Sequence, residues 1–145
     1  MKCFNIQINS SLSLNPHYKV VAAVIEHNGK FLCMQKGKSK YPYLSNTFEF
    51  PGGKIEAGET PESALVREVM EELNLAIVVG SSLEVIHHQY PDFSIDLLPF
   101  RCTVATNTIT LNEHVSFQWL EASALPSLHW AAADVPIVQA VVHGY

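Results

Sequence analysis

The segment from Phe50 to Leu75, FPGGKIEAGETPESALVREVMEELNL, constrains this chain more than any other. It places Glu59 in a loop and Glu68, Glu71 and Glu72 on a predicted helix. The spacing i, i+3 and i+4 puts side chains on one helical face, with Cβ atoms about 5–6 Å apart. Like charges this close repel each other, so the segment predicts a bound cation.

The predicted helix has a clear start and a clear end. Thr60 is a suitable N-cap, and Pro61 fits the first helical position, where its missing N–H costs nothing. Asn74 suits the left-handed position that ends a helix. Between them an apolar residue recurs every four positions and predicts a stripe packed on a core: Leu65, Val69 and Leu73. The helix is therefore expected to run from about residue 60 or 61 to residue 73.

The donor atoms of the segment indicate which cation would bind. It offers carboxylates and backbone carbonyls but no His or Cys, which favours Mg²⁺ or Mn²⁺ over zinc. Gly52 and Gly53 allow the backbone to approach a metal or a phosphate closely. Arg67 is positioned to bind Glu59 through a bidentate contact and so to orient the loop on the helix. The competing interpretation is a solvated acidic helix face.

Composition limits the class of protein. A chain of 145 residues with 48% hydrophobic content suits one domain spanning residues 1–145. The net charge of −5 argues against nucleic-acid binding, which normally uses a basic face. The scattered Cys3, Cys33 and Cys102 suit a reducing compartment. Without an apolar secretory signal or an 18-residue apolar span, we expect a cytoplasmic protein outside the membrane.

Hydrophobic patterning predicts a mixed sheet built around this helix. Residues 1–17 are expected to form an edge strand or an arm. Val20–Ile25 is a strand buried on both faces, and Asn28-Gly29 predicts a type I′ turn into a strand at Lys30–Gln35. Further strands are expected at 48–50, 76–79, 82–89, 93–103 and 116–120, with a break at residues 90–92. A last helix over 133–143 would bury four residues: Val135, Val138, Val141 and Val142.

Other polar residues are candidates for substrate contacts. Three lysines between residues 36 and 40 form either a solvated turn or a phosphate or base contact, and Lys36, directly after a strand, is the best placed. Lys54, after the two glycines, is a further candidate. His87 and His88 alternate along a strand and face opposite ways, so a surface or pocket-wall position suits them better than metal binding.

The acidic segment resembles the Nudix hydrolase signature. The matching residues are Gly53, Glu59, Arg67, Glu68, Val69, Glu71, Glu72 and Leu75, and Asn74 replaces the usual glycine. Because Asn tolerates the same backbone conformation, this departure affects helix-end geometry more than a metal site. Flanking segments are similar to the MutT-like branch, including VVAAVI, the YPD turn and AAADVP. The resemblance implies an α+β fold, a mixed β-sheet between α-helices (α/β/α).

The resemblance also implies a reaction and a set of residues. MutT-like Nudix enzymes split nucleoside triphosphates into a monophosphate and pyrophosphate. Carried over, divalent metal would be bound by the carbonyl of Gly53 and by four carboxylates: Glu68, Glu71, Glu72 and Glu113. Either Glu68 or Glu113 would accept the proton of the attacking water, and Arg67 would orient the site. Gly52 and Glu59 would have structural roles.

Base recognition would involve the residue before the last helix. By resemblance Asp134 reads the base edge, where related oxidised-guanine enzymes often carry Asn. An ionised Asp only accepts hydrogen bonds, whereas a protonated one also donates. Both an oxidised guanine nucleotide such as 8-oxo-dGTP and CTP or a modified pyrimidine nucleotide are therefore candidate substrates. Asp134 could instead cap the last helix, and Tyr90 or Phe48 could stack on the base or simply fill the core.

Two other functions remain open. The chain could hydrolyse another nucleoside diphosphate derivative, such as ADP-ribose or a dinucleoside polyphosphate. It could also be a catalytically silent Nudix domain that senses a nucleotide, although silent members tend to lose a metal-binding Glu and none is lost here. We expect a monomer or a homodimer that acts on a nucleotide with Mg²⁺.

Overall fold

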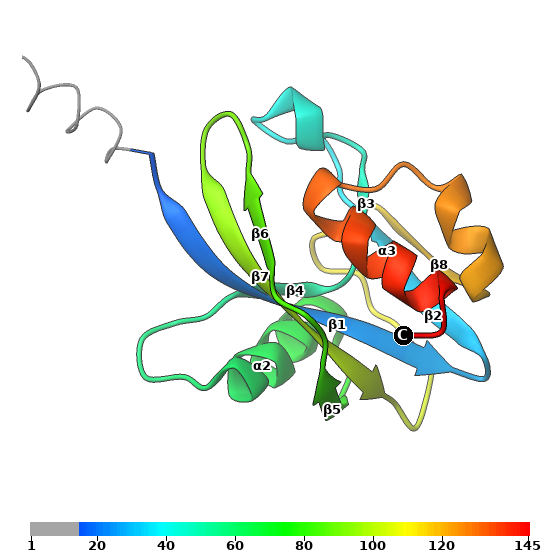
Figure 1. Cartoon of the computed structure of the whole chain (residues 1–145). Coiled ribbons are helices and arrows are strands. Elements are labelled where there is room, and N and C mark those ends of the chain that lie inside the picture. The colour runs from blue at the N-terminus through cyan, green and yellow to red at the C-terminus, as the bar shows by residue number, and fades with distance from the viewer. Residues whose placement is uncertain (1–14) are drawn as a thin grey trace, which may run out of the picture.

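The computed structural model describes residues 15–145. The predicted N-terminal edge strand or arm falls outside this range except for its last three residues, of which His17 already begins a strand. Within the described range, an eight-stranded mixed sheet has α2 on one face and α3 on the other (Figure 1). This arrangement confirms the predicted α+β fold.

The sheet is built around a parallel pair of long strands. The strands are β1 (His17–His27), β2 (Lys30–Gln35), β3 (Phe48–Glu49), β4 (Gly52–Lys54), β5 (Val78–Ser82), β6 (Ile86–Gln89), β7 (Ser94–Thr103) and β8 (Ser116–Leu120). The main path is β3-β2-β1-β7-β5, while β4 pairs with β1, β6 with β7 and β8 with β2. β1 and β7 are parallel, and all the other strand pairs are antiparallel.

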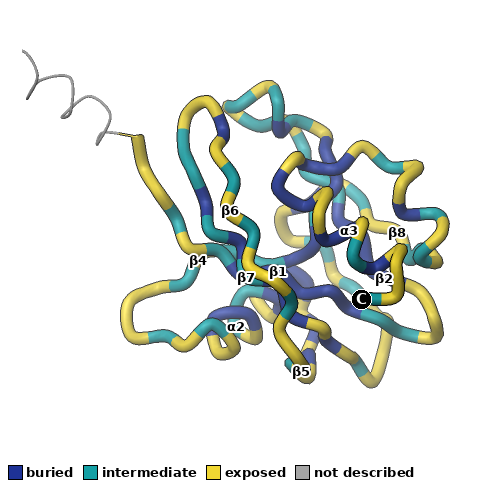
Figure 2. Tube along the Cα trace, viewed as in Figure 1, coloured by how far each residue is buried: buried dark blue, intermediate teal, exposed yellow. Residues whose placement is uncertain are grey.

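Strand β1 supplies both hydrophobic cores, because successive side chains along a strand point to opposite faces. Val21, Ala23 and Ile25 pack with the buried stripe of α2 (Pro61–Leu73). Ala22 and Val24 pack in the second cluster, with α3 (Val135–Val142). Figure 2 shows this buried central sheet beneath more exposed loops. The prediction of a strand buried on both faces is confirmed.

Helix α2 begins and ends as predicted. The Thr60 hydroxyl accepts a hydrogen bond from the Ser63 backbone N–H at 3.1 Å, and the Ser63 hydroxyl accepts one from the Thr60 N–H at 3.1 Å. Together these contacts form a capping box that leaves two N-terminal amides satisfied. At the other end Asn74 has a φ of 52°, in the left-handed region. Asn28 and Gly29, with φ of 52° and 75°, likewise form the predicted turn.

Two predicted elements differ from the structure. The last helix is divided into a 3-10 turn, η3 (Ala132–Asp134), and α3, whose buried residues are Ile137, Val138 and Val141. Val135 and Val142 are exposed at its two ends, so their predicted burial is wrong. With 3.6 residues per turn, Ile137, Val138 and Val141 share the face that meets the core, and Val135 and Val142 project to one side of it.

The strands after α2 are also displaced from their predicted positions. β5 runs over residues 78–82 and its register against β7 shifts between Val79 and Ser82. A Cβ at Gly80 would lie 2.9 Å from the Arg101 carbonyl oxygen, so the glycine lets the two backbones approach at this irregularity. The predicted strand at 82–89 is consequently divided, and β6 begins only at Ile86. Two further 3-10 turns, η1 (Pro42–Leu44) and η2 (Ala122–Ser127), complete the fold.

Candidate functional site

An open cavity of about 850 Å³ brings together most of the predicted site residues. Its walls come from β1, β3, β4, α2, the loop after β2 and the turns around residues 90, 113 and 134. The predicted residues that line it are Lys36, Gly52, Gly53, Lys54, Glu68, Glu72, Tyr90, Glu113 and Asp134. Glu71 does not line the cavity, and its side chain is 57% exposed.

Carboxylates crowd together at one end of this cavity, which we call the acidic end (Glu68, Glu72 and Glu113). Glu72 is buried and accepts a hydrogen bond from the Gly52 N–H at 3.3 Å. Burial first, and then the nearby carboxylates of Glu49, Glu68 and Glu113, raise the pKa of Glu72 to about 9. Burial is also the largest cause that raises the pKa of Glu68. The ionised form of Glu72, which a metal would need as a ligand, therefore carries a free-energy cost that a bound cation would relieve.

Arg67 joins the loop and the helix at the acidic end. Its Nε and Nη2 donate to the two carboxylate oxygens of Glu59 at 2.6 and 2.9 Å, which confirms the predicted bidentate contact. This contact is the main reason that the pKa of Glu59 falls to about 2. The Nη1 of Arg67 also donates to Glu68 at 2.8 Å and to Glu71 at 2.9 Å. The sequence prediction missed these two contacts, although an Arg and a Glu four residues apart on a helix are a recognisable pair.

Both predicted glycines are required by their surroundings. A Cβ at Gly52 would collide with the backbone carbonyl of Val21, because β4 lies close against β1. A Cβ at Gly53 would occupy the position of the Glu68 carboxylate. The groups that approach these glycines are the β1 backbone and the Glu68 side chain, and the predicted approach to a metal or a phosphate stays a prediction.

The fit of this site to a divalent metal depends on its donors. In residues 15–145, no three His, Cys, Asp or Glu side chains are already arranged as a metal-ligand group. Two of the predicted ligands, Glu68 and Glu71, are instead bound by Arg67. The donors of the acidic end are nevertheless all oxygens, and the buried Glu72 lies among three other carboxylates. Such a donor set fits a hard cation such as Mg²⁺ or Mn²⁺.

The other end of the cavity, which we call the aromatic end, contains Asp134 and Tyr90. Asp134 is buried, and its Oδ2 accepts a hydrogen bond from the Phe50 N–H at 2.9 Å. Asp134 occupies the predicted N-cap position of α3, but its side chain makes no capping hydrogen bond there. Burial, followed by the charge of Glu49, raises its pKa to about 8. A pKa of about 8 favours the protonated form of Asp134 at neutral pH.

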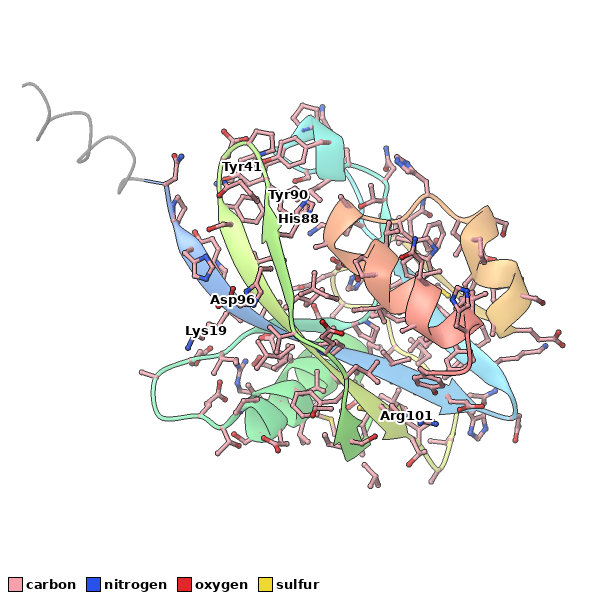
Figure 3. The ribbon with its side chains drawn as sticks, in the orientation of Figure 1. Lys19, Tyr41, His88, Tyr90, Asp96 and Arg101 are labelled. Carbon is pink, nitrogen blue, oxygen red and sulfur yellow. The ribbon has the colours of Figure 1, made fainter. Side chains whose placement is uncertain are left out.

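Aromatic rings surround this end of the cavity. The Tyr90 hydroxyl accepts a hydrogen bond from the Ala133 N–H at 3.0 Å, and its ring stacks on Tyr43 with centroids 5.5 Å apart. Tyr41 stacks in turn on Tyr43, and His88 packs edge-on against Tyr90 (Figure 3). His88 is thus part of the wall behind Tyr90, whereas Phe48 is buried against Trp130 and does not line the cavity.

Two predicted lysines line the cavity and come from different segments, Lys36 after β2 and Lys54 at the end of β4. Lys36 Nζ lies 3.8 Å from Glu49 Oε1, and Lys54 Nζ lies 3.9 Å from the centre of the Tyr18 ring. Lys38 and Lys40 also line the cavity. An anionic ligand in the cavity would therefore meet positive charge. His87 instead contacts Asp96 at 2.6 Å on the surface, away from the cavity lining.

Comparison with known proteins identifies the class. The model of the NUDIX domain family matches residues 15–141, so the chain belongs to this family and is a Nudix hydrolase. Nudix hydrolases in general depend on divalent metal. This membership confirms the resemblance stated from the acidic segment. None of the helices in residues 15–145 is long and apolar enough to cross a membrane.

Relatives with assigned activities are similar over much of the chain. A CTP pyrophosphohydrolase of Escherichia coli K12 is 31% identical over 122 residues, which cover 84% of this chain and 89% of that protein. An 8-oxo-dGTP diphosphatase of Proteus vulgaris is 38% identical over 93 residues, covering 63% of this chain and 80% of the relative.

Solved structures agree with this assignment. The solution structure of the E. coli ORF135 protein has a TM-score of 0.74 and 30% identity, covering 88% of this chain and 90% of that one. A MutT protein of the Nudix hydrolase family from methicillin-resistant Staphylococcus aureus 252 has a TM-score of 0.71 and 35% identity. Its match covers 91% of this chain and all of that protein.

Proposed function

We propose that this chain hydrolyses a nucleoside triphosphate to a nucleoside monophosphate and pyrophosphate, using Mg²⁺, with Mn²⁺ as an alternative. The observation that carries the proposal is one cavity that contains a carboxylate cluster around the buried Glu72, lysines, and an aromatic end with the buried carboxyl group of Asp134. These three parts suit a metal, a polyphosphate and a base, respectively. The names of the two relatives support the same reaction class.

Four carboxylates and one carbonyl would hold the metal: Glu68, Glu71, Glu72, Glu113 and the backbone oxygen of Gly53. When bound, divalent metal supplies charge neutralisation on the phosphates and orientation of the attacking water. Glu68 or Glu113 accepts the proton from that water. The raised pKa of Glu68 makes its carboxylate a stronger base, and Arg67 fixes the direction in which it points.

Lysines and aromatic rings would hold the rest of the nucleotide. Lys36 and Lys54 line the same cavity as the acidic end and offer charge to the phosphates. Tyr90, stacked on Tyr43, offers the edge or face of a ring to the base. The negative net charge of the protein supports a free nucleotide as its substrate rather than a nucleic acid.

Asp134 would read the edge of the base as a donor. Because its Oδ2 accepts the Phe50 N–H, the proton of the buried carboxyl is available on Oδ1. A protonated Asp offers one donor and one acceptor and so resembles Asn in hydrogen bonding. An oxidised guanine such as that of 8-oxo-dGTP has carbonyl oxygens that accept from this donor, and the cytosine of CTP has a ring nitrogen and a carbonyl oxygen that do so. Both triphosphates are proposed as substrates to be compared.

A nucleotide panel tests this function. The protein is incubated with Mg²⁺ and each common triphosphate, 8-oxo-dGTP, ADP-ribose and a dinucleoside polyphosphate, and the products are separated. Pyrophosphate and a monophosphate are expected from one triphosphate in preference to the rest. Orthophosphate release would contradict the proposed cleavage position, and hydrolysis of ADP-ribose alone would move the function to another Nudix branch. Nucleotide binding without turnover would indicate a sensing domain.

The remaining features follow from the same proposal. We propose one catalytic domain that spans the chain and works as a monomer or a homodimer in the cytoplasm. Size-exclusion chromatography with light scattering would measure the oligomeric state directly.

A further inference from the structure

The loop that carries Glu113 is fastened on both sides of that residue. On one side, Asn112 donates from its side chain to the Glu71 carbonyl at 2.7 Å and from its backbone to the Glu72 carbonyl at 3.2 Å. On the other side, His114 Nε2 lies 2.8 Å from Glu49 Oε2. Glu113 is therefore held between the C-terminal end of α2 and strand β3.

His114 is a buried imidazole that uses only one of its two ring nitrogens within residues 15–145. Its side chain is only 4% exposed, and its Nδ1 is buried without a hydrogen-bond partner in the described part of the chain. An unpaired buried nitrogen lowers stability, since it loses its hydrogen bond to water without a replacement. An apolar side chain of similar volume would avoid this cost. The imidazole is thus retained at a position where packing alone would favour another residue.

Glu49, the partner of His114, lies between the two ends of the cavity. Its carboxylate raises the pKa of Glu72 at the acidic end and that of Asp134 at the aromatic end, so it is electrostatically close to both. Its second oxygen faces Lys36 Nζ at 3.8 Å. Because a carboxylate accepts hydrogen bonds, His114 donates from Nε2 and connects the loop of Glu113 to this junction.

We propose that His114 is a positioning residue that fixes Glu113 toward Glu68 and Glu72 by anchoring the next residue of the loop to Glu49. The inference rests on the proposed function, because it assigns His114 an effect on the proposed role of Glu113. His114 acts through the backbone and does not touch the substrate. Asn112 sets the position of the loop along α2, and His114 sets its position across the cavity.

The test uses a variant that keeps the packing and removes the hydrogen bond. His114→Phe is expected to leave Tm unchanged or raised and to lower kcat about 10–100-fold, since a shift of about 1 Å in a site has effects of this size. KM should change little. His114→Gln, whose amide N–H can reach Glu49, should recover most of the activity. His143→Ala is the matched control, since His143 is exposed at the end of α3 and its side chain, within residues 15–145, bonds the Gln139 carbonyl and no cavity residue.

A double-mutant comparison separates positioning from a general structural effect. In a Glu113→Gln background, His114→Phe should lower kcat by less than about threefold more, because residues that act as one unit are not additive. Equal losses in both backgrounds would overturn the inference. Should His114→Phe fold poorly, His114→Ala and His114→Gln allow the same comparison.

Manganese binding gives a readout that does not depend on turnover. Electron paramagnetic resonance should show a several-fold weaker Kd for Mn²⁺ in His114→Phe and no change in His143→Ala. If the wild-type protein binds Mn²⁺ but hydrolyses no triphosphate, the proposed function fails while this comparison still decides the positioning role. An unchanged Kd and an unchanged kcat in His114→Phe would remove that role and leave the proposed function intact. Absence of Mn²⁺ binding by the wild-type protein would refute both.

Discussion

The acidic and aromatic ends of the cavity are built in different ways. Apart from Glu113, the acidic end comes from one continuous stretch, in which the loop of Gly52 and Gly53 lies against the helix that carries Glu68 and Glu72. The aromatic end joins groups distant in sequence, since Asp134 bonds Phe50 and Tyr90 bonds Ala133. Local sequence thus encodes the proposed chemistry, whereas tertiary packing positions the groups proposed to select the base.

Substitution of Glu72 should have the largest effect. Glu72→Gln keeps the hydrogen bond from Gly52 but removes a carboxylate from the centre of the acidic end. We expect kcat to fall by about 10³-fold or more, as when a main source of charge stabilisation is lost. The smaller loss expected from Glu71→Gln reflects its position outside the cavity lining. Glu62→Gln, at an exposed position in the first turn of the same helix, is the control. Equal kcat values in all three variants would show that the acidic end does not take part in catalysis.

Substitution of Arg67 should have an intermediate effect. Arg67→Lys keeps the positive charge but cannot make the bidentate contact with Glu59 and the contact with Glu68 together. Roughly tenfold lower kcat is expected, because the Glu68 carboxylate is no longer fixed. A lower Tm should accompany it, measured by thermal denaturation. Full activity in Arg67→Lys would mean that charge alone suffices and that orientation does not matter.

Protonation of Asp134, at the aromatic end, should determine how kcat/KM depends on pH. Asp134 donates only while protonated, so kcat/KM of the wild-type enzyme should fall as pH rises through the pKa of about 8. Asp134→Asn carries a donor at every pH and should flatten this decline, while it keeps the acceptor for the Phe50 N–H. Steady-state kinetics between pH 6 and 9.5 with the preferred triphosphate would measure both profiles. Parallel profiles would remove Asp134 from base recognition.

The smallest expected effect is on stability. The pKa of Asp134 is raised from 3.8 to about 8 in the folded protein, so the folded state keeps a proton that the unfolded chain loses on passing pH 4. The free energy of unfolding therefore falls as pH rises from about 4 to 8. Tm should decrease over this range in the wild type and decrease by less in Asp134→Asn. Scanning calorimetry at low ionic strength would measure the difference, and identical slopes would argue against a protonated Asp134.

Local features of the fold were predictable, while contacts across the chain were not. Capping residues and the apolar stripe define α2, and Asn28-Gly29 defines the hairpin, because short-range sterics and hydrogen bonds suffice. The predicted burial of Val135 and Val142 at the ends of α3 was wrong, because burial there depends on how the helix packs against the sheet. The same limit applies to the site: Arg67 and Glu59 are eight residues apart and were found, whereas His114 and Glu49 are 65 apart and were missed.

The loop between β7 and β8 also provides the last hydrogen bonds of α2. Thr110 and Asn112 donate to the carbonyls of Leu73 and Glu72, which helix geometry leaves unpaired. Residues 105–108 are also exposed, but within residues 15–145 no hydrogen bond joins them to α2. An insertion before residue 109 would lengthen a surface loop at little entropic cost, whereas one after Thr110 would shift Glu113 out of register with the helix. This connection thus has one half that tolerates changes in length and one half that does not.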